Sequence, residues 1–350
     1  MTAKLSLPPL PALPTVAAIV PCLNENAFIG QFLHSILKMD YEPERLSIWV
    51  VDGMSTDGTR EILATWAARE PRLHVLDNPR HTTACALNLA LRASRSDVVV
   101  RLDVHADYPR HYISHLVALL QQHGADNVGA LRLTAPGNTA WGNAFASLVS
   151  APFGNGGAAW RSHPHGLCEV ESVFCGCYPR AVFDRIGYFD ESMIRIEDRE
   201  FNARLRQAGG RILLDPTVTC VYHPRTQLRS YLRWIFSGPF RVFYSRRLTR
   251  TRLFGARNLV PAAFVLYHLV LPVAIWLIGW IAVFPLIVYA LLAVVASIGE
   301  ARLHRRWVML LLLPPLFYLT HWSYGVGSLW GILRSILPMP APSPEGKFAH

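Results

Sequence analysis

The chain has 350 residues, of which 51% are apolar, and a formal net charge of +10 at pH 7. Most of that charge lies in residues 241–350, where eleven Lys or Arg and two acids give a net charge of +9. These basic residues flank long apolar runs, as they do on the cytoplasmic side of membrane proteins, so a nucleic-acid partner is not expected.

The first residues, 1–14, are expected to form a flexible N-terminal tail, since Leu5–Pro14 is rich in Pro and Leu. The apolar stretch Val16–Val20 is too short, and too closely bounded by proline, to be a signal peptide. We therefore interpret it as the first strand of a soluble domain.

Strands and helices are predicted to alternate from Val16 onward. The sequence favours strands at Val16–Val20, Ser47–Val51, Leu73–Leu76 and Val98–Leu102, and helices at Ala27–Lys38, Thr59–Ala68, Thr82–Ala93 and Pro109–Gln122. Alternation at this spacing predicts an α/β fold with helices on both faces of a parallel sheet. A dinucleotide-binding Rossmann domain is a competing interpretation, but the first turn, Pro21–Glu25, lacks the GxGxxG pattern.

A first acidic site lies at Asp52, which follows the apolar residues Ile48–Val51. A carboxylate there lies at the carboxyl edge of the sheet, where open α/β sheets bind ligands. The Gly, Ser and Thr residues that follow offer N–H and hydroxyl groups suited to a ribose and phosphates. The alternative is an ordinary loop in which Asp57 caps the next helix.

A second acidic site follows the apolar run Val98–Val100. Asp103 again lies at the carboxyl end of a strand, and His105 is two residues further along. Carboxylate and phosphate oxygens suit Mg²⁺ or Mn²⁺, and an imidazole favours Mn²⁺, so we expect these side chains to bind a divalent cation that bridges two phosphates. The alternative is that His105 and Asp107 cap the helix after Pro109, and capping is our interpretation of Asp107.

A further helix is predicted after Arg195, ending at Gly209. Phe201 and Leu205 are four residues apart and should bury one face of it. Glu200 and Arg204 should form an exposed ion pair at the same spacing.

Two adjacent acids, Glu197 and Asp198, lie at the start of this helix. The positive end of the helix dipole favours ionised carboxylates there. An ionised Asp beside a cleft can act as a general base toward a sugar hydroxyl. The alternative is that both acids only cap the helix.

Two long runs without charged residues, Asn258–Gly299 and Trp307–Leu333, flank the basic loop Arg302–Arg306. A bilayer crossing needs about 20 residues, so the first run fits two helices with a turn near Gly279–Pro285, and the second fits one. Six arginines precede the first crossing and none separates the first two, which places residues 1–257 in the cytoplasm. Prolines and glycines in the third run leave a re-entrant segment as an alternative.

Between the soluble domain and these runs, Leu228–Phe254 interleaves arginines with aromatic residues. Such a composition suits a helix that lies in the headgroup layer of a membrane. The alternative is a stalk packed on the soluble domain. The aromatic residues are Tyr231, Trp234, Phe236, Phe240, Phe243 and Tyr244.

The six cysteines should stay reduced in a cytoplasmic domain. Cys168, Cys175 and Cys177 lie near His163 and His165, but their spacing matches no common zinc pattern. A zinc cluster is therefore only the alternative interpretation.

Four motifs occur in order along the chain: Pro-x-x-Asn-Glu, Val-Asp-Gly-x-Ser-x-Asp-Gly-Thr, Arg-x-Asp-x-His-Ala and Glu-Asp-x-Glu-x-Asn-x-Arg-Leu. Together they resemble the family 2 inverting glycosyltransferases with the GT-A fold. Asn78–Pro109, Phe153–Arg161 and Phe174–Glu191 resemble, more narrowly, the succinoglycan-type (ExoA-like) glucosyltransferases. The resemblance covers about residues 15–240.

The fold that this resemblance implies is an α/β, Rossmann-like GT-A domain that binds a nucleotide sugar, with a mostly parallel sheet, followed by C-terminal transmembrane helices. We expect the tail at 1–14, the GT-A domain at 15–226 and the amphipathic interfacial segment at 227–257. A membrane domain of about three helices should follow at 258–335, and a C-terminal tail at 336–350.

The resemblance also implies roles for individual residues. Asp198 would be the catalytic base, and Glu197 would contact the acceptor. Mg²⁺ or Mn²⁺ would be bound by Asp103 and His105, although the family's usual Asp-x-Asp is here Asp-x-His. The nucleotide sugar would contact Pro21, Asn24, Glu25, Asp52, Asn88, Arg101 and Asp103.

The implied function is transfer of a hexose, glucose from UDP-glucose, to a polyprenyl-diphosphate-linked saccharide in exopolysaccharide biosynthesis. The protein would be a multi-pass protein of the cell (inner) membrane, with its catalytic domain in the cytoplasm and membrane lipid as a partner. A processive polysaccharide synthase is an alternative, but Ser230 replaces the Gln of its Gln-x-x-Arg-Trp motif. An inactive nucleotide-sensing membrane protein is another, but Asp52, Asp103 and Asp198 are intact.

Overall fold

The computed structural model of the chain describes residues 7–137, 139–156, 166–223, 227–245, 253, 255 and 258–337. Two compact units make up the chain. The first, here called the sheet unit, contains Met1–Leu133 and Ala159–His223. The second, the helical unit, contains Thr134–Ala158 and Pro224–His350.

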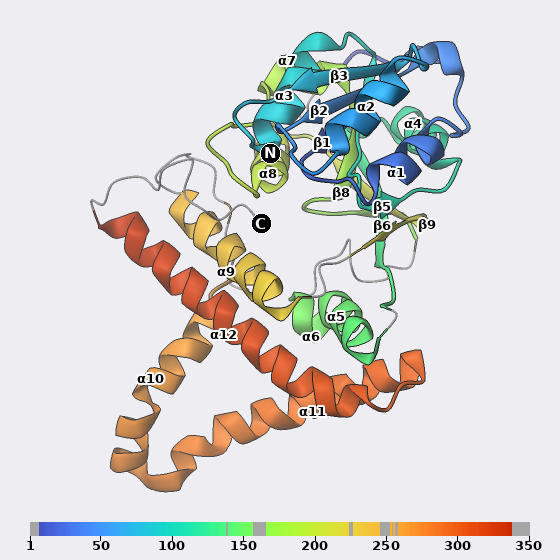
Figure 1. The fold of residues 1–350 in the computed structure, drawn as a ribbon. Coiled ribbons are helices and arrows are strands. Elements are labelled where there is room, and N and C mark those ends of the chain that lie inside the picture. The colour runs from blue at the N-terminus through green and yellow to red at the C-terminus, as the bar shows by residue number, and fades with distance from the viewer. Residues whose placement is uncertain are drawn as a thin grey trace. The chain divides into compact units, whose positions relative to one another are not determined.

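The N-terminal half of the sheet unit is a parallel α/β arrangement, as predicted (Figure 1). Four strands lie in the order β3-β2-β1-β4, and each predicted strand and helix is present with its ends shifted by at most three residues. The strands are β1 (Val16–Cys22), β2 (Leu46–Asp52), β3 (Leu73–Asp77) and β4 (Val98–Arg101). The helices are α1 (Ile29–Ile36), α2 (Thr59–Ala67), α3 (Thr83–Ala93) and α4 (Tyr112–His123).

The rest of the sheet is antiparallel, so the nine-stranded sheet of the described residues is mixed. β8 (Phe174–Pro179) runs antiparallel to β4 and to β6 (Asn127–Thr134). β9 (Ile212–Tyr222) pairs antiparallel with two short strands, β5 (Ala106–Asp107) and β7 (Cys168–Glu169). The helices α7 (Arg180–Ile186) and α8 (Glu197–Gln207) separate β8 from β9. The expected mostly parallel sheet therefore describes β1–β4 alone.

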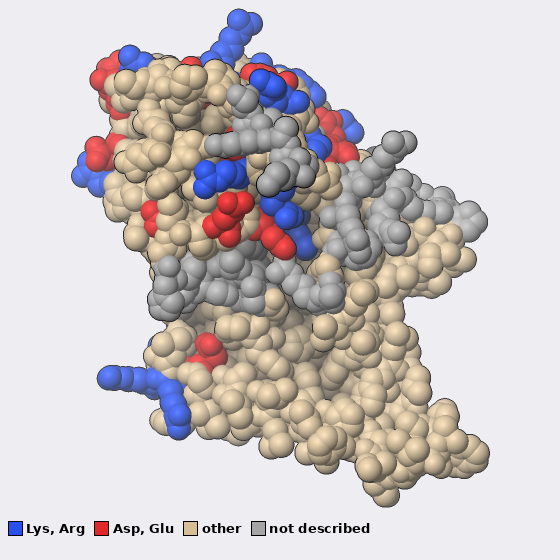
Figure 2. Space-filling view, turned by 180° about the vertical axis from the view of Figure 1, so that it is seen from behind, with Lys and Arg blue, Asp and Glu red and all other residues tan. Residues whose placement is uncertain are grey.

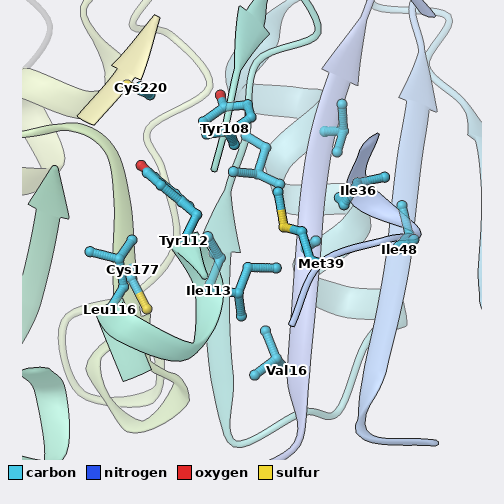
Figure 3. Packing of buried hydrophobic residues seen from close by; sticks show 14 of the residues in the cluster. Val16, Ile36, Met39, Ile48, Tyr108, Tyr112, Ile113, Leu116, Cys177 and Cys220 are labelled. Carbon is cyan, nitrogen blue, oxygen red and sulfur yellow. The ribbon is translucent and has the colours of Figure 1, made fainter. Parts of the chain in front are cut away.

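Both faces of the sheet are covered by helices. Successive residues of β1 point to opposite faces, so the buried residues of this strand divide between two cores. Val16, Ala18 and Val20 belong to a core with α1 and α4. Figure 3 shows part of this core, including Ile36 and Tyr112. On the other face, Ala17 and Ile19 of β1 belong to a core with α3, α7 and α8. Burial on both sides explains why the strands appear in the sequence as continuous apolar runs.

The helical unit combines an insertion with the C-terminal helices. The insertion forms α5 (Ala140–Ser150) and α6 (Pro152–Asn155), and Phe145 of α5 lies in a core with Tyr231 and Phe317. The C-terminal helices are α9 (Leu228–Tyr244), α10 (Val260–Ile278), α11 (Phe284–His304) and α12 (Met309–Ile336), with a short 3₁₀ helix, η5 (Gly279–Val283), between α10 and α11.

Glycines on α12 allow close approach of its neighbours. A Cβ at Gly327 would lie 2.3 Å from the carbonyl oxygen of Phe236, and one at Gly331 would lie 2.5 Å from that of Phe240. Both phenylalanines belong to α9, which lies along α12 (Figure 1). The predicted aromatic helix is therefore packed on a C-terminal helix, and its position in the headgroup layer stays a prediction.

One helical stretch of the described residues, Val260–His304, is long and apolar enough to cross a membrane, with a mean hydropathy of 2.7 in its most apolar window. Its apolar side chains are largely exposed, with 83% of Trp276 and 80% of Trp280 accessible. The face of the helical unit drawn in Figure 2 carries few charges. The predicted turn near Gly279–Pro285 coincides with η5. α12 does not pass the same test, so the third crossing stays a prediction.

The two units divide the chain by its contacts and do not test the five predicted segments, which stay a prediction. Residues 134–158 were expected within the GT-A domain, but their contacts group them with the C-terminal helices. His321 of α12 illustrates these contacts. Its Nε2 lies 2.9 Å from the carbonyl oxygen of Phe153 in the insertion, and its Nδ1 lies 2.9 Å from the hydroxyl of Tyr289 in α11, so one side chain joins three segments of the helical unit. The predicted C-terminal tail lies almost wholly outside the described residues.

Candidate active site

The loops after β1 and β2 are fastened together at the carboxyl edge of the sheet. The backbone N–H of Asn24 donates to Oγ of Ser55 at 2.8 Å, and Oδ1 of Asn24 accepts from the N–H of Thr56 at 2.9 Å. Asn24 has a left-handed φ of 54°, which asparagine tolerates better than most residues. The N–H of Glu25 donates to Oγ1 of Thr59 at 2.9 Å. Two predicted nucleotide-site residues, Asn24 and Glu25, therefore lie in two loops joined by hydrogen bonds, here called the double loop.

Asp52 ends β2 beneath this double loop and is 1% exposed. Its carboxylate accepts from the N–H and the hydroxyl of Ser55, and from Nη1 of Arg60 at 2.7 Å. Arg60 is 39% exposed and also pairs with Asp77 at 2.9 Å. A ligand that binds Asp52 must therefore share this carboxylate with Arg60 or displace it.

Arg101, the last residue of β4, joins the second and third acidic sites. Its Nε and Nη2 each lie 3.3 Å from Oδ1 of Asp103, and its Nη1 lies 3.2 Å from Oε1 of Glu197. Burial opposes the charge of Arg101, but the carboxylates of Asp103 and Glu197 outweigh that effect and raise its pKa. Three predicted site residues thus form one buried ion-pair network.

His105 lies beyond Asp103 in the loop between β4 and β5. Its Nδ1 is 3.2 Å from Oε1 of Glu25, and its ring packs edge-on against Tyr222. The hydroxyl of Tyr108 accepts from the backbone N–H of Asp103 at 2.8 Å and so fixes the backbone of this loop. Both predicted cation ligands therefore lie at the carboxyl edge, near the double loop.

The capping role expected for Asp107 is wrong. Asp107 lies in β5, and its Oδ2 is 2.8 Å from Nε2 of His223. The helix that follows begins after His111, without a side-chain cap. The short strand β5 intervenes between the loop and the helix, and this removes Asp107 from the helix end.

Glu197 and Asp198 occupy the first turn of α8, as predicted. Glu197 is 4% exposed, and its Oε2 has no hydrogen-bond partner among the described residues. Burial raises the pKa of Glu197 to about 7, against the lowering effect of Arg101. Asp198 is half-buried, and its Oδ1 accepts from the N–H of Arg199 at 2.7 Å. The two neighbouring acids therefore have different surroundings.

The body of α8 anchors this turn. Phe201 and Leu205 are fully buried, as predicted. Glu200 and Arg204 form the predicted pair at 2.9 Å, but it is not exposed, because Glu200 is 2% accessible. Arg204 also donates to the carbonyl oxygen of Tyr188 at 2.8 Å, which explains the burial of the pair. The pair fixes α8 to the preceding loop.

Comparison with known proteins agrees with this arrangement. The family model described as Glycosyl transferase family 2 matches residues 17–152. The succinoglycan biosynthesis protein ExoA of Rhizobium meliloti (strain 1021) is 32% identical over 287 residues, which cover 78% of this chain and 81% of ExoA. The chain belongs to glycosyltransferase family 2.

A more distant relative and a solved structure also match the chain. A dolichyl N-acetyl-alpha-D-glucosaminyl phosphate 3-beta-D-2,3-diacetamido-2,3-dideoxy-beta-D-glucuronosyltransferase of Methanococcus voltae is 20% identical over 63% of this chain and 71% of its own length. The structure of mannosyltransferase PcManGT from Pyrobaculum calidifontis, in complex with GDP-Man and Mn²⁺, aligns with a TM-score of 0.63 at 22% identity. The alignment covers 93% of this chain and 90% of that one, and shows that this glycosyltransferase has the GT-A fold.

Two further residues were predicted in the nucleotide-sugar site of this glycosyltransferase. In the structure, the side chain of Asn88 bonds to another segment of the protein, and Pro21 lies within a strand. Asn88 of α3 is 1% exposed, and its amide bonds to both the N–H and the carbonyl oxygen of Phe189 and to Glu191. Pro21 lies in β1 opposite Val51, beyond the end of the ladder with β4. Direct contact of either residue with a nucleotide sugar stays a prediction.

Sequence reasoning missed several residues that shape the glycosyltransferase site. Ser55, Thr59 and Arg60 hold the double loop and Asp52, and Tyr108 holds the backbone of Asp103. Arg60 follows Asp52 by eight residues, at the start of the next helix, and this spacing was an available signal. Nothing in the sequence pointed to Tyr108. Its hydroxyl reaches the backbone of Asp103 only because the short strand β5, directly before it, directs the chain back toward that loop.

The six cysteines of this glycosyltransferase are all described and form no disulfide there, and their reduced state in the cell stays a prediction. Among the described residues, no group of three or more His, Cys, Asp or Glu could hold a metal ion. His163 and His165 of the alternative zinc cluster lie outside the described residues.

Proposed function

We propose that this glycosyltransferase transfers a hexose, glucose from UDP-glucose, to a polyprenyl-diphosphate-linked saccharide in exopolysaccharide biosynthesis. The reaction is a single displacement that inverts the anomeric carbon, and it takes place at the cytoplasmic face of the membrane. Asp198 is the general base, and Glu197 contacts the acceptor.

The observation that carries this proposal is the buried bridge from Asp103 through Arg101 to Glu197. Asp103 follows β4 by two residues, at the edge where α/β sheets bind ligands, and Glu197 begins a helix that carries the second acid, Asp198. A displacement needs a leaving-group site on one side of the reacting carbon and, on the other side, a base within reach of the attacking hydroxyl, and a single guanidinium joins the two motifs here.

The donor set fits a divalent cation that is shared with a diphosphate. Asp103 and His105 supply an oxygen and a nitrogen, and both bonds from Arg101 to Asp103 end on Oδ1, which leaves Oδ2 for another partner. Two protein ligands are few, which suits Mg²⁺ or Mn²⁺ because such ions are commonly held jointly by carboxylates and substrate phosphates. The cation would offset the charge of the leaving diphosphate.

The remaining steps belong to residues of the chain. The double loop at Asn24 and Glu25, with Asp52 beneath it, binds the nucleoside. Asp198, in the first turn of α8, takes the proton of the attacking hydroxyl. Because base and leaving group lie on opposite faces of the sugar, the product has the inverted configuration, as in inverting glycosidases.

The relatives support the substrate classes. ExoA is by its name a succinoglycan biosynthesis protein, which supports an exopolysaccharide product. PcManGT was solved with GDP-Man and Mn²⁺, which supports a nucleotide-sugar donor and a divalent cation.

The decisive experiment incubates the purified full chain with UDP-glucose, UDP-galactose and GDP-mannose, each with a membrane lipid extract and either Mn²⁺ or a chelator. We expect cation-dependent transfer of one sugar from UDP-glucose to a lipid product. Polymer formation would favour the processive synthase. Nucleotide binding without hydrolysis or transfer of any donor would favour the inactive sensor.

The proposed topology is multi-pass and can be tested by labelling single cysteines in intact cells with an impermeant thiol reagent. Ile281 and Leu303 are suitable positions, because their side chains are 71% and 70% exposed. Five of the six native cysteines are buried and give a low background. Cysteines at Ile281 and Lys347 should label, and one at Leu303 should not. Labelling at Leu303 alone would contradict a cytosolic donor.

A further inference from the structure

Arg101 is a cation in a buried position. It ends β4, which lies between β1 and β8 in the sheet, and its side chain is 13% exposed. A buried guanidinium is costly unless it is paired and hydrogen-bonded. Its partners therefore indicate what the residue is placed there to hold.

The two partners come from separate parts of the chain. The Nε and Nη2 edge of Arg101 contacts Asp103, two residues away, and Nη1 contacts Glu197, 96 residues away. The side chains of Asp103 and Glu197 are 14% and 5% exposed. A guanidinium has a rigid planar fork, so the two carboxylates are fixed relative to each other through it.

Each carboxylate keeps one oxygen that Arg101 does not engage. Oε2 of Glu197 is buried without a partner among the described residues, and a buried acceptor of this kind calls for a donor. A hydroxyl group of the acceptor saccharide would donate that hydrogen bond. The corresponding oxygen at the nucleotide-sugar subsite is Oδ2 of Asp103.

Resting on the proposed function, we propose that Arg101 is a positioning residue that couples the donor subsite at Asp103 to the acceptor subsite at Glu197. It orients both carboxylates and divides its charge between them. It is not itself a contact for the nucleotide sugar, the role that the family resemblance suggested. If Glu197 loses its charge, the positive charge of Arg101 acts on Asp103 alone. Asp103 then attracts the divalent cation less strongly, and binding of the cation and the nucleotide weakens.

The test is a double-mutant cycle on the full chain, read by calorimetric titration of UDP in the presence of Mn²⁺. At pH 8, where Glu197 is ionised, we expect Glu197→Gln to weaken UDP·Mn²⁺ binding roughly threefold to tenfold, a coupling within the range usual for residues of one network. In the Arg101→Gln background the same change should have less than about half of that effect on a logarithmic scale. Equal effects in both backgrounds would overturn the proposal.

A second variant guards against a fold that does not tolerate Arg101→Gln. Arg101→Lys keeps the charge, but a single ammonium cannot reproduce the two-edged fork. It should raise the KM for both donor and acceptor. A rise for the donor alone would assign Arg101 to nucleotide contact and overturn the proposal, and a fall in thermal stability with both KM values unchanged would reduce it to a structural residue.

The matched control is Arg180→Lys. Arg180 has a similarly shielded side chain, 19% exposed, and donates to the carbonyl oxygen of Ser94 at the opposite end of β4. This variant should lower thermal stability and leave both KM values unchanged. A wild-type chain that binds neither UDP nor GDP with Mn²⁺ would instead contradict the proposed function, and the coupling would fall with it.

Discussion

In the sheet unit, polar side chains tie one loop to another at the carboxyl edge, whereas in the helical unit backbones meet directly at glycines. Asn24, Ser55 and Thr59 illustrate the first arrangement, and Gly327 and Gly331 the second. In the sheet unit the large apolar side chains are mostly buried, but along Val260–His304 many are exposed. Side-chain hydrogen bonds thus hold the carboxyl edge of the sheet unit together. In the helical unit, close approach of two helix backbones holds α9 against α12.

The difference predicts how each unit responds to substitution. Removal of one oxygen or nitrogen at the carboxyl edge should impair binding or chemistry and leave the fold intact. Addition of one methyl group between α9 and α12 should impair folding and leave the chemistry of folded molecules intact. The following predictions test this contrast.

The largest effect is expected at Asp198. Asp198→Asn should lower transfer by about 10²–10⁴-fold, because the amide cannot take the proton of the acceptor hydroxyl. Binding of UDP·Mn²⁺ and the melting temperature should change little. Transfer at close to the wild-type rate would show that another group is the base.

A smaller effect is expected at the donor subsite. Asp103→Ala should weaken UDP·Mn²⁺ binding by roughly 100-fold and remove stimulation by metal, since direct ligands cost at least as much as outer partners. His105→Asp should shift the preference from Mn²⁺ toward Mg²⁺. Asp107→Ala, in the exposed pair with His223, is the control and should behave as wild type. Full activity in excess chelator would contradict a cation role.

Glu197 should make stability depend on pH. Its pKa is raised in the folded chain to about 7, so the stability of the protonated form is present at low pH and is lost as the pH rises through 7. Each unit of pKa difference corresponds to about 1.4 kcal/mol. Relative to Glu197→Gln, the wild type should therefore melt at a lower temperature at pH 8 than at pH 5. A difference that is the same at both pH values would refute the burial argument.

The smallest effect is expected in the helical unit. Gly327→Ala should destabilise the packing of α9 on α12 by about 1–3 kcal/mol, because the new methyl group overlaps the carbonyl oxygen of Phe236. Gly299→Ala in α11 is the matched control, since no atom lies within 4 Å of its Cβ position. Thermal unfolding in detergent measures both. Equal melting temperatures would show that the helices can separate without cost.

Much of the sheet unit could be predicted from the sequence because local patterns determine it. Each of the first four strands is an apolar run followed by a turn and a helix, and the acids Asp52 and Asp103 follow such runs directly. The two-residue strands β5 and β7 carry no period, and without β5 the role of Asp107 was misassigned. The antiparallel return through β8 likewise depends on pairing with strands far away in sequence.

The site residues divide in the same way. Asn24, Glu197 and Asp198 belong to motifs that could be recognised locally. The bridge through Arg101 could not, because its two partners are brought together only by the completed sheet and α8. The burial of the Glu200–Arg204 pair was missed for the same reason, since the loop that covers it lies outside the helix.

The insertion that forms α5 and α6 has a consequence for biosynthesis. Phe153 meets His321, 168 residues later in the chain, and Ser147 meets Met309, 162 residues later. A ribosome that adds about 5–20 residues per second delivers those partners roughly 8–34 s after the insertion emerges. During that interval the apolar face around Phe145 lacks its partners in α12, such as Phe317, and it is then a natural binding surface for a chaperone or a nascent-chain targeting factor. A nascent chain arrested before α12 should therefore be aggregation-prone in a way that the finished protein is not.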